Sequence, residues 1–324
     1  MKVALIGTGS IAPVHLRGIL EANEEVVALC DIVPEKAEEL KKAFNLKAEI
    51  YADYKEMLAK ENLDVIHLCT PHYLHYEMII STLKRNINVL AEKPICINKS
   101  ELTKIKEELR NSSAKLGICL QNRYLPANQT LKSLLEDEEI LLGKAKLLWS
   151  RDEAYYKASP WRGKWDTAGG GVMINQAIHT LDLLLWFCGL PNKIKGKVTN
   201  TNLTDFIEVE TTAEFALSGK NQAHFYATTT CSDNFPIEIE IVTTKNKYKI
   251  FGDDLYINGS LQEFPEIGPG YGKPYWGAGH KYLIQDFYKC LQEKRPFPID
   301  ILEAEKALNV IWALYQSKGE EVYL

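Results

Sequence analysis

Short apolar runs alternate with amphipathic stretches along the first part of the chain. The runs are mostly apolar, as strands buried on both faces of a sheet are, and they span residues 2–6, 26–30, 48–51, 64–69, 88–91 and 115–121. The stretches between them have helical periodicity and span residues 11–22, 34–44, 54–60, 73–85 and 98–111. This alternation predicts an α/β domain with a doubly wound parallel sheet, covered by helices on both faces.

The pattern changes after Arg123. From there strand-like segments follow one another with little helix between them, at 144–149, 211–217, 222–230, 236–243 and 247–251. Helices are expected at 127–136, 171–188, 281–292 and 302–316. We therefore predict two domains: residues 1–122 with the parallel sheet, and residues 123–324 of α+β class with a large, mostly antiparallel open sheet.

A glycine turn joins the first predicted strand to the first helix, and it reads Gly7-Thr8-Gly9-Ser10-Ile11-Ala12. Gly7 permits a tight turn, Gly9 lets the backbone approach a pyrophosphate, and Ala12 is small enough for close packing of helix on strand. The helix N-terminus offers N–H groups and a partial positive charge to the phosphates. An ordinary turn is the alternative, but strand, helix and second strand in this order favour a Rossmann domain that binds a dinucleotide.

Asp31 ends the second predicted strand, 22 residues beyond Gly9. A carboxylate at this place accepts hydrogen bonds from the adenine ribose hydroxyls and repels a 2′-phosphate. No arginine follows in residues 32–36, although Lys36 could swing round to a phosphate. We therefore expect NAD as the cofactor, with NADP less favoured.

Composition and charge limit the binding partners and the cellular compartment that we expect. The 324 residues carry a formal net charge of −5, and there is no basic stripe to bind nucleic acid. The seven cysteines are scattered without a C-x-x-C pair, and no His, Cys or Asp cluster has metal-ligand spacing, so we expect neither disulfides nor a metal. Met1 leads straight into the first strand and no apolar run is long enough to span a bilayer, so we expect a cytoplasmic protein without a membrane partner.

Ligand-binding groups in such sheets gather beyond the carboxyl ends of the strands. The residues predicted at those ends are Thr70, Pro71, His72, Lys93, Asn122 and Arg123. Pro94 ends the strand before it, so the ammonium of Lys93 is held at the rim, where it can bond a substrate oxygen. A positive nicotinamide ring nearby would lower the pKa of Lys93 toward neutrality. A solvated surface lysine is the alternative.

Asn175, His179 and Asp182 are predicted on one polar face of a helix, beside its apolar stripe. His179 suits general acid–base chemistry at neutral pH. Asp182 could hold the imidazole ring, and Asn175 could hold a substrate hydroxyl. A buried histidine bonded within the fold is the alternative.

An aromatic loop carries Trp161 and Arg162 side by side. The pair suits a flat, partly charged ligand, through stacking and bidentate hydrogen bonds, although an ordinary packed loop is possible. Tyr155, Arg123 and His280 are expected to shape the substrate pocket. The remaining candidates, His15, His67 and His224, are expected to be structural.

These motifs together resemble the Gfo/Idh/MocA family (glucose–fructose oxidoreductase, inositol dehydrogenase, rhizopine catabolism) over essentially the whole chain. They are Gly7-x-Gly9-x-x-Ala12, Thr70-Pro71-x-x-x-His75, Glu92-Lys93-Pro94, Asn122-Arg123, Trp161-Arg162, Gly169-Gly170-Gly171 and Asn175-x-x-x-His179-x-x-Asp182. The resemblance implies NAD(P)-dependent oxidation or reduction of a sugar, cyclitol or sugar derivative, with Lys93 and His179 as the catalytic pair. It also implies an open sheet that packs against another subunit, hence a homodimer or homotetramer.

The resemblance also assigns residues to the cofactor. It implies that Trp161 and Arg162 reach the nicotinamide half. The motif residues at the strand ends would contact the cofactor as well: Thr70, Pro71, His72, His75, Glu92, Lys93 and Asn122. Two positions depart from the family pattern, because His72 replaces the usual asparagine and Asn175 stands where many members have aspartate. Asn175 is also similar to members that act on sugar nucleotides with an N-acetyl group.

We therefore predict an NAD-dependent oxidoreductase that acts on a ring hydroxyl or ketone. His179 would take the hydroxyl proton, Lys93 would polarise the oxygen, and Asn175 would hold the substrate, since an amide takes no proton. A redox-assisted glycoside hydrolase that recycles tightly held NAD remains open, as does a nucleotide-binding sensor without turnover. The complete set of three residues argues against the sensor.

Overall fold

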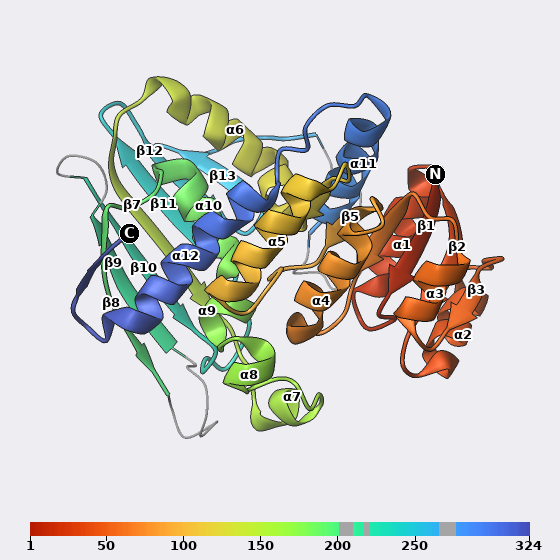
Figure 1. Ribbon diagram of the computed structural model, residues 1–324. Coiled ribbons are helices and arrows are strands. Elements are labelled where there is room, and N and C mark those ends of the chain that lie inside the picture. The colour runs from red at the N-terminus through yellow and green to blue at the C-terminus, as the bar shows by residue number, and fades with distance from the viewer. Residues whose placement is uncertain (201–209, 217–220, 266–276) are drawn as a thin grey trace. The chain divides into compact units, whose positions relative to one another are not determined.

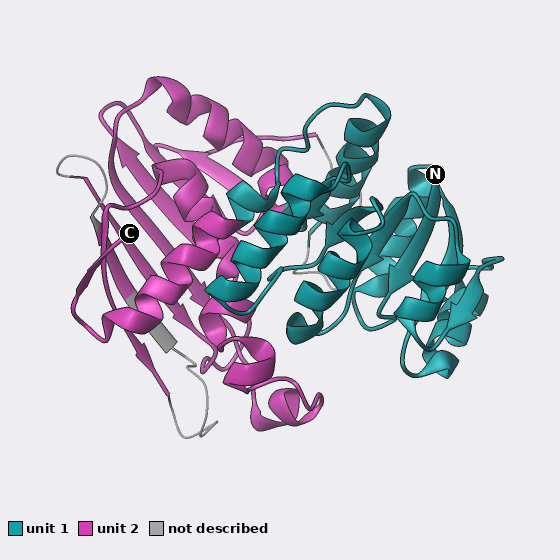
Figure 2. Cartoon of the chain, in the orientation of Figure 1, with its two compact units in different colours: residues 1–121, 268–304 teal, residues 122–267, 305–324 magenta. Residues whose placement is uncertain are grey.

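The computed structural model describes residues 1–200, 210–216, 221–265 and 277–324, and of 210–212 and 216 only the backbone. It contains two compact units (Figure 2): unit 1 comprises residues 1–121 and 268–304, and unit 2 comprises residues 122–267 and 305–324. The sequence places one boundary after residue 122, close to the first crossing of the chain. It does not anticipate that 268–304 return to unit 1.

Unit 1 is built on a six-stranded sheet in the order β3-β2-β1-β4-β5-β6, and every pair in it is parallel (Figure 1). Its strands are β1 (Lys2–Ile6), β2 (Glu25–Cys30), β3 (Glu49–Tyr51), β4 (Val65–Leu68), β5 (Asn88–Ala91) and β6 (Leu116–Ile118). Its helices are α1 (Ala12–Glu21), α2 (Pro34–Ala43), α3 (Tyr54–Lys60), α4 (His72–Leu83), α5 (Lys99–Asn111) and α11 (Gly279–Gln292). The predicted parallel sheet is confirmed.

The order of the strands reverses between β1 and β4, which lie side by side with Val3 opposite Val65. In open α/β sheets this reversal is where ligands bind, outside the carboxyl ends of the strands. Helix α11 packs on α1 so closely that a Cβ on Gly18 would lie 2.6 Å from Cδ1 of Ile284. The late segment of the chain is therefore part of the core of unit 1.

Unit 2 is built on a nine-stranded sheet in the order β14-β13-β12-β11-β7-β10-β9-β8-β15. Its strands are β7 (Ile140–Leu148), β8 (Lys193–Thr199), β9 (Glu210–Ala216), β10 (Gln222–Thr228), β11 (Glu238–Thr243), β12 (Lys247–Phe251), β13 (Asp254–Ile257), β14 (Ser260–Leu261) and β15 (Glu321–Tyr323). Among these strands β7 and β10 pair in parallel and the other pairs are antiparallel. The predicted mostly antiparallel sheet is confirmed.

The helices of unit 2 include the 3-10 helices η1 (Gln121–Tyr124, which begins at the last residue of unit 1) and η2 (Leu135–Asp137), and α6 (Pro126–Leu134), α7 (Glu153–Lys157), α8 (Trp165–Ala168), α9 (Val172–Asn175), α10 (Ile178–Cys188) and most of α12 (Ile301–Ser317). The longer of them cover one face of the sheet (Figure 1). Figure 1 shows α6, α10 and α12 across the sheet. A Cβ on Gly143 of β7 would lie 2.6 Å from Sγ of Cys188, so α10 is in close contact with the central strands.

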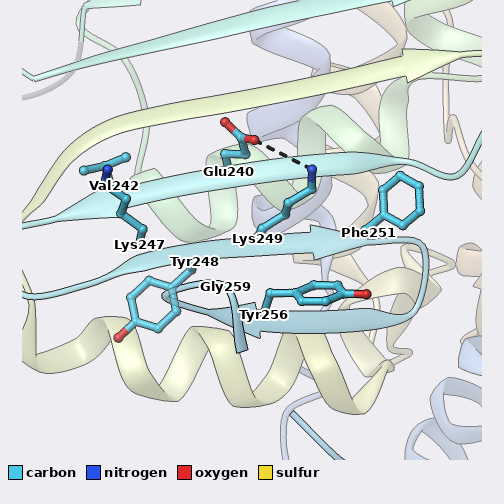
Figure 3. A pocket seen from close by; sticks show the side chains of 8 residues that line it. All are labelled: Glu240, Val242, Lys247, Tyr248, Lys249, Phe251, Tyr256 and Gly259. Atoms are coloured by element: carbon cyan, nitrogen blue, oxygen red, sulfur yellow. Dashed lines mark ion pairs between the residues drawn. The ribbon is translucent and has the colours of Figure 1, made fainter. Parts of the chain in front are cut away.

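The opposite face of the sheet is polar and mixed in charge. Along β11 and β12 the residues Ile239, Ile241 and Ile250 are buried on the helix side, while Lys249 and Phe251 stay accessible on the other. Figure 3 shows a hollow on this part of the sheet. Its lining residues are Glu240, Val242, Lys247, Tyr248, Lys249, Phe251, Tyr256 and Gly259.

The helix predicted over 171–188 is broken. Helix α9 ends at Asn175 and α10 begins at Ile178, with a bend of 54° between the segment 165–175 and α10. The N–H of Ala177 bonds the carbonyl of Val172 at 2.7 Å, a wide turn that adds a residue to the helical repeat. Asn175 therefore does not share one continuous helix face with His179 and Asp182, and that part of the prediction is wrong.

Among the described residues, no single helix has the length and apolar composition needed to cross a bilayer. Only the bent pair of segments 165–175 and 178–188 has this length and this apolar composition, and only when its two parts are counted together.

Candidate active site

The glycine turn of unit 1 has the two properties that a phosphate cradle needs. Gly7 has φ +90°, and a Cβ there would lie 2.7 Å from the backbone carbonyl of Cys69, so only glycine fits. Gly9 is the opposite case, because no described heavy atom lies within 4 Å of the place its Cβ would occupy. Ala12 is fully buried at the start of α1, where helix and strand meet. The turn leaves open space directly above its second glycine.

Asp31 is fixed beside this turn. Its Oδ2 accepts hydrogen bonds from the N–H and the hydroxyl of Thr8, both at 2.8 Å. Its Oδ1 accepts one from the N–H of Val33 at 3.0 Å. Ser10, on the turn itself, is exposed. The carboxylate predicted to bind ribose hydroxyls therefore has a defined orientation, set by a residue of the glycine turn.

The loops after β4 and β5 are tied together by His75. Its Nδ1 lies 2.7 Å from the carbonyl oxygen of Pro94, and its Nε2 lies 2.8 Å from that of Thr70. His75 is fully buried and His72 is 5% exposed in the first turn of α4. Both ring nitrogens of His75 are thus engaged within unit 1, and the ring connects the Thr70-Pro71 loop to the Glu92-Lys93-Pro94 segment.

Lys93 follows β5 directly and is half-buried. Burial lowers the pKa of its amine, while the charges of Glu92 and Cys119 act in the opposite direction. Glu92 itself bonds two imidazoles: its Oε1 lies 3.2 Å from Nε2 of His15 and 3.1 Å from Nε2 of His280. His280, predicted to line the substrate pocket, is 3% exposed and lies at Glu92.

In unit 2, Arg123 and Asp182 form a two-pronged ion pair. Nε of Arg123 donates to Oδ2 of Asp182 at 2.8 Å, and Nη2 donates to Oδ1 at 2.6 Å. The two residues are 4% and 1% exposed, and the guanidinium lies 5.4 Å from the ring centre of Trp186. The sequence predicts that Arg123 contacts the substrate and that Asp182 holds the ring of His179. In the structure, Arg123 and Asp182 bond each other.

Tyr155 contacts several of the remaining candidate residues of unit 2. Its hydroxyl accepts hydrogen bonds from Asn175 at 3.4 Å and from Gln176 at 3.2 Å. The guanidinium of Arg162 lies 4.5 Å from the ring centre of Tyr155 and 5.5 Å from that of Trp161. His179 lies in the first turn of α10, four residues beyond Asn175, and is half-buried. The structure therefore brings Asn175, Gln176 and Arg162 to Tyr155, and Gln176 is an addition to the predicted residues.

The sequence reasoning missed the environment of Glu92. His15 and His67 were expected to be structural, and no metal-ligand spacing was found. The structure places one ligand atom each of His15, Glu92 and Cys119 within 4.8 Å of one another. These residues are far apart in the chain, so a search of the sequence for closely spaced metal ligands does not find them.

A model of an oxidoreductase family with an NAD-binding Rossmann fold, GFO_IDH_MocA, matches residues 1–119. A second model, the GFO/IDH/MocA C-terminal domain, matches residues 128–249. The chain belongs to the Gfo/Idh/MocA family. Unit 1 therefore carries the NAD-binding fold of that family.

Relatives in the Gfo/Idh/MocA family are similar over part of the chain. The inositol 2-dehydrogenase/D-chiro-inositol 3-dehydrogenase of Lactiplantibacillus plantarum is 27% identical over 188 residues, 57% of this chain and 51% of that protein. The D-glucoside 3-dehydrogenase of Escherichia coli K12 is 26% identical over 195 residues, 59% and 55% of the two chains. The matched part thus spans about half the length of these relatives.

The fold also matches a solved structure. The WlbA dehydrogenase from Bordetella pertussis, determined in complex with NADH and UDP-GlcNAcA, superposes with a TM-score of 0.86 at 24% identity, over 100% of this chain and 98% of that one. At this identity the match concerns the fold. It agrees with the predicted combination of a Rossmann sheet and a mostly antiparallel sheet.

The residues of unit 1 fit a dinucleotide. The unfilled space over Gly9 would admit a pyrophosphate, and no described side chain caps the start of α1. The carbonyls of Gly9 and Ile11 already accept from the N–H groups of Ala12, Val14 and His15, so the helix start offers a phosphate the positive end of its dipole. Asp31 offers a fixed carboxylate at the end of the neighbouring strand β2. An open glycine turn, the positive end of a helix dipole and an oriented acid are features that the adenosine diphosphate half of NAD requires.

Proposed function

We propose that this Gfo/Idh/MocA member is an NAD-dependent dehydrogenase or reductase that acts on a ring hydroxyl or ketone of a sugar, cyclitol or sugar derivative. The observation that carries the proposal is the open cradle at Gly9 next to the fixed carboxylate of Asp31, with Lys93 at the end of β5 in the same sheet. The names of the relatives, an inositol dehydrogenase and a D-glucoside dehydrogenase, support this substrate class.

Bound NAD would supply the hydride acceptor, and reduced NAD the donor. Gly7 to Ile11 and Asp31 would hold the adenosine diphosphate half, and Thr70, Pro71, His72 and His75 would shape the floor beside it. By the family resemblance, Trp161 and Arg162 would reach the nicotinamide half, and Asn122 would also contact the cofactor. Asp31 favours NAD, because its carboxylate repels the 2′-phosphate of NADP.

Lys93 and His179 divide the work on the substrate oxygen in this proposal. The ammonium of Lys93 donates a hydrogen bond to the oxygen and stabilises alkoxide character there. The imidazole of His179 takes the hydroxyl proton during oxidation and returns it during reduction. Asn175, bonded to Tyr155, orients a neighbouring substrate hydroxyl.

The decisive experiment measures nicotinamide absorbance against a panel of sugars, cyclitols and sugar nucleotides, with NAD and NADP side by side. We expect turnover with NAD on at least one cyclic polyol, and loss of turnover with retained NADH binding in Lys93→Met and His179→Ala. Full activity in either variant removes that residue from the mechanism.

Two other results would redirect the proposal. Release of sugar from a glycoside without net NADH would indicate the redox-assisted hydrolase. Tight NADH binding with no turnover on the whole panel would indicate a sensor.

We further propose that the protein works in the cytoplasm as a homodimer or homotetramer that associates through the open face of the nine-stranded sheet. All seven cysteines, each in the described part of the chain, are free thiols, which suits a reducing compartment. The accessible Phe251 and Tyr256 between charged side chains on this face suit a partner sheet with the same mixed character.

A further inference from the structure

We infer that Glu92 is a positioning residue: a buried negative charge, fixed by His15 and His280, that keeps the neighbouring amine of Lys93 in its ammonium form. The inference rests on the proposed role of Lys93, and it adds which group determines the protonation state of that amine. It concerns only unit 1, to which Glu92, Lys93 and both histidines belong.

The contacts of Glu92 suit an ionised carboxylate. Two imidazole Nε2 atoms approach the same oxygen, Oε1, at 3.2 and 3.1 Å, and Oε2 lies 3.3 Å from the N–H of Lys93. A carboxylate accepts all three bonds, whereas a carboxylic acid would have to place a proton among donors. Burial alone would raise the pKa of Glu92, but the bonds from His15 and His280 outweigh it and hold the pKa well below its ordinary value.

The histidine next to Glu92 is itself held in one tautomer. Since Glu92 only accepts, Nε2 of His15 carries the proton and its Nδ1 accepts from Nδ1 of His67 at 2.8 Å. Nε2 of His67 then accepts from the hydroxyl of Tyr288, also at 2.8 Å. Burial lowers the pKa of both histidines, and burial raises that of Tyr288 far above its ordinary range. The chain of bonds therefore orients His15 without supplying a positive charge.

His280 is the second histidine that bonds Glu92. Its Nε2 donates to Glu92, and its Nδ1 is buried without a hydrogen-bond partner among the residues that the structure describes. The two imidazoles thus fix the carboxylate of Glu92 next to the backbone N–H of Lys93.

Lys93 is the group that this charge acts on. The other titratable groups around the pair in unit 1 are Cys69, Cys119 and His75. Burial raises the pKa of both thiols well above the ordinary value, so both are neutral near pH 7, and burial lowers the pKa of His75. Burial would also drive Lys93 toward its neutral form, and the charge of Glu92 opposes this.

The test is Glu92→Gln, because the amide oxygen can still accept from both histidines while the charge is gone. The readout is the pH dependence of acetylation at Lys93, followed by mass spectrometry, which needs no turnover. We expect the midpoint for Lys93 to fall by at least about one pH unit. The alkaline limb of the kcat/KM profile should fall by the same amount, with the Kd for NADH unchanged within about twofold.

Two variants accompany this one. Glu92→Asp keeps the charge and should restore a midpoint close to that of the wild type. Glu24→Gln removes another buried carboxylate of unit 1, which bonds the N-terminal amine and Gln292. It should lower thermal stability and leave the midpoint of Lys93 where it was. Glu24 is thus the control for a merely structural loss.

An unchanged midpoint in folded Glu92→Gln overturns the inference, and so does a stoichiometric divalent cation held by His15, Glu92 and Cys119 in the purified protein. If Glu92→Gln does not fold, a midpoint of Lys93 in Glu92→Asp that lies about one pH unit or more below that of the wild type also overturns it. Failure of the proposed function is seen separately, as full activity of Lys93→Met, and leaves the acetylation result standing.

Discussion

Gly7 and Gly9 lie two residues apart in one turn, yet their surroundings differ. We predict that Gly7→Ala costs roughly 3 kcal/mol in free energy of unfolding, because its Cβ would meet the backbone of Cys69 at 2.7 Å from a left-handed conformation. Gly9→Ala should leave the unfolding free energy nearly unchanged and weaken NADH binding by about tenfold. Urea unfolding and NADH fluorescence titration of both variants check the pair. Equal effects of the two substitutions on binding and stability would contradict the assignment.

The ion pair of Arg123 and Asp182 gives a second prediction at this scale. Asp182→Asn leaves a buried guanidinium without its counter-charge, so we expect a loss of about 3–5 kcal/mol in free energy of unfolding. The matched control is Glu153→Gln, which breaks the exposed pair with Lys157 and should cost about 0.5 kcal/mol or less. Chemical denaturation of both proteins measures the difference, and similar losses would mean that the buried pair has no special weight.

Single residues were predictable where the chemistry is local. The glycine turn, Asp31 and Lys93 are identified by neighbours in the sequence, because a strand end and a helix start are built from adjacent residues. Arg123 and Asp182 are 59 residues apart, and Glu92 and His280 are 188 apart. Nothing in a single sequence indicates that such residues meet, so Arg123 and His280 were assigned to the substrate on their chemistry alone.

At the scale of elements, His67 on β4 and Tyr288 on α11 join the sheet to the returning helix. His15 and His67 have folded pKa values below the ordinary 6.5, and Glu92 has one below 4.5. The unfolded chain therefore binds more protons than the folded one as the pH falls below about 6.5, and the folded state loses stability with acid.

The unfolding free energy should therefore change with pH along a measurable slope. Each buried neutral imidazole adds about 1.4 kcal/mol of lost stability per pH unit below its unfolded pKa. His67→Gln, which can still bond both neighbours, should reduce the slope of unfolding free energy between about pH 6 and pH 5 by about that amount. Urea unfolding across this range tests it. A slope identical to that of the wild type would show that His67 is protonated in the folded state.

The elements of unit 1 were predicted almost to their ends, because buried parallel strands are apolar runs and the helices between them have amphipathic periodicity. The break between α9 and α10 was not. Residues from Val172 to Leu185 are compatible with one helix by composition, and the wide turn at Ala177 depends on a backbone bond that leaves no mark in the sequence. Periodicity reports which face is buried more reliably than where a helix bends.

At the scale of the whole molecule, the nine-stranded sheet gives a prediction about assembly. Phe251 is 39% exposed on the open face, and Leu190, in the loop after α10, is 48% exposed. If the open face is the interface, Phe251→Glu should raise the dissociation constant of the oligomer by at least about tenfold, and Leu190→Glu should not change it. Light scattering over a dilution series measures both. Dissociation by the second variant and not the first would place the interface elsewhere.

The route of the chain between the units limits how this protein can be divided. The core of unit 1 includes Ile284 against α1 and Tyr288 against His67, and both come from the segment 268–304. A fragment that ends after the sixth strand would retain every residue of the nucleotide-binding motif, but it would lack part of its own hydrophobic core. A piece that keeps this core together would join 1–121 to 268–304 by a linker. Recombination at a single point, the simplest way to exchange a nucleotide-binding module between proteins, would separate two parts of one core.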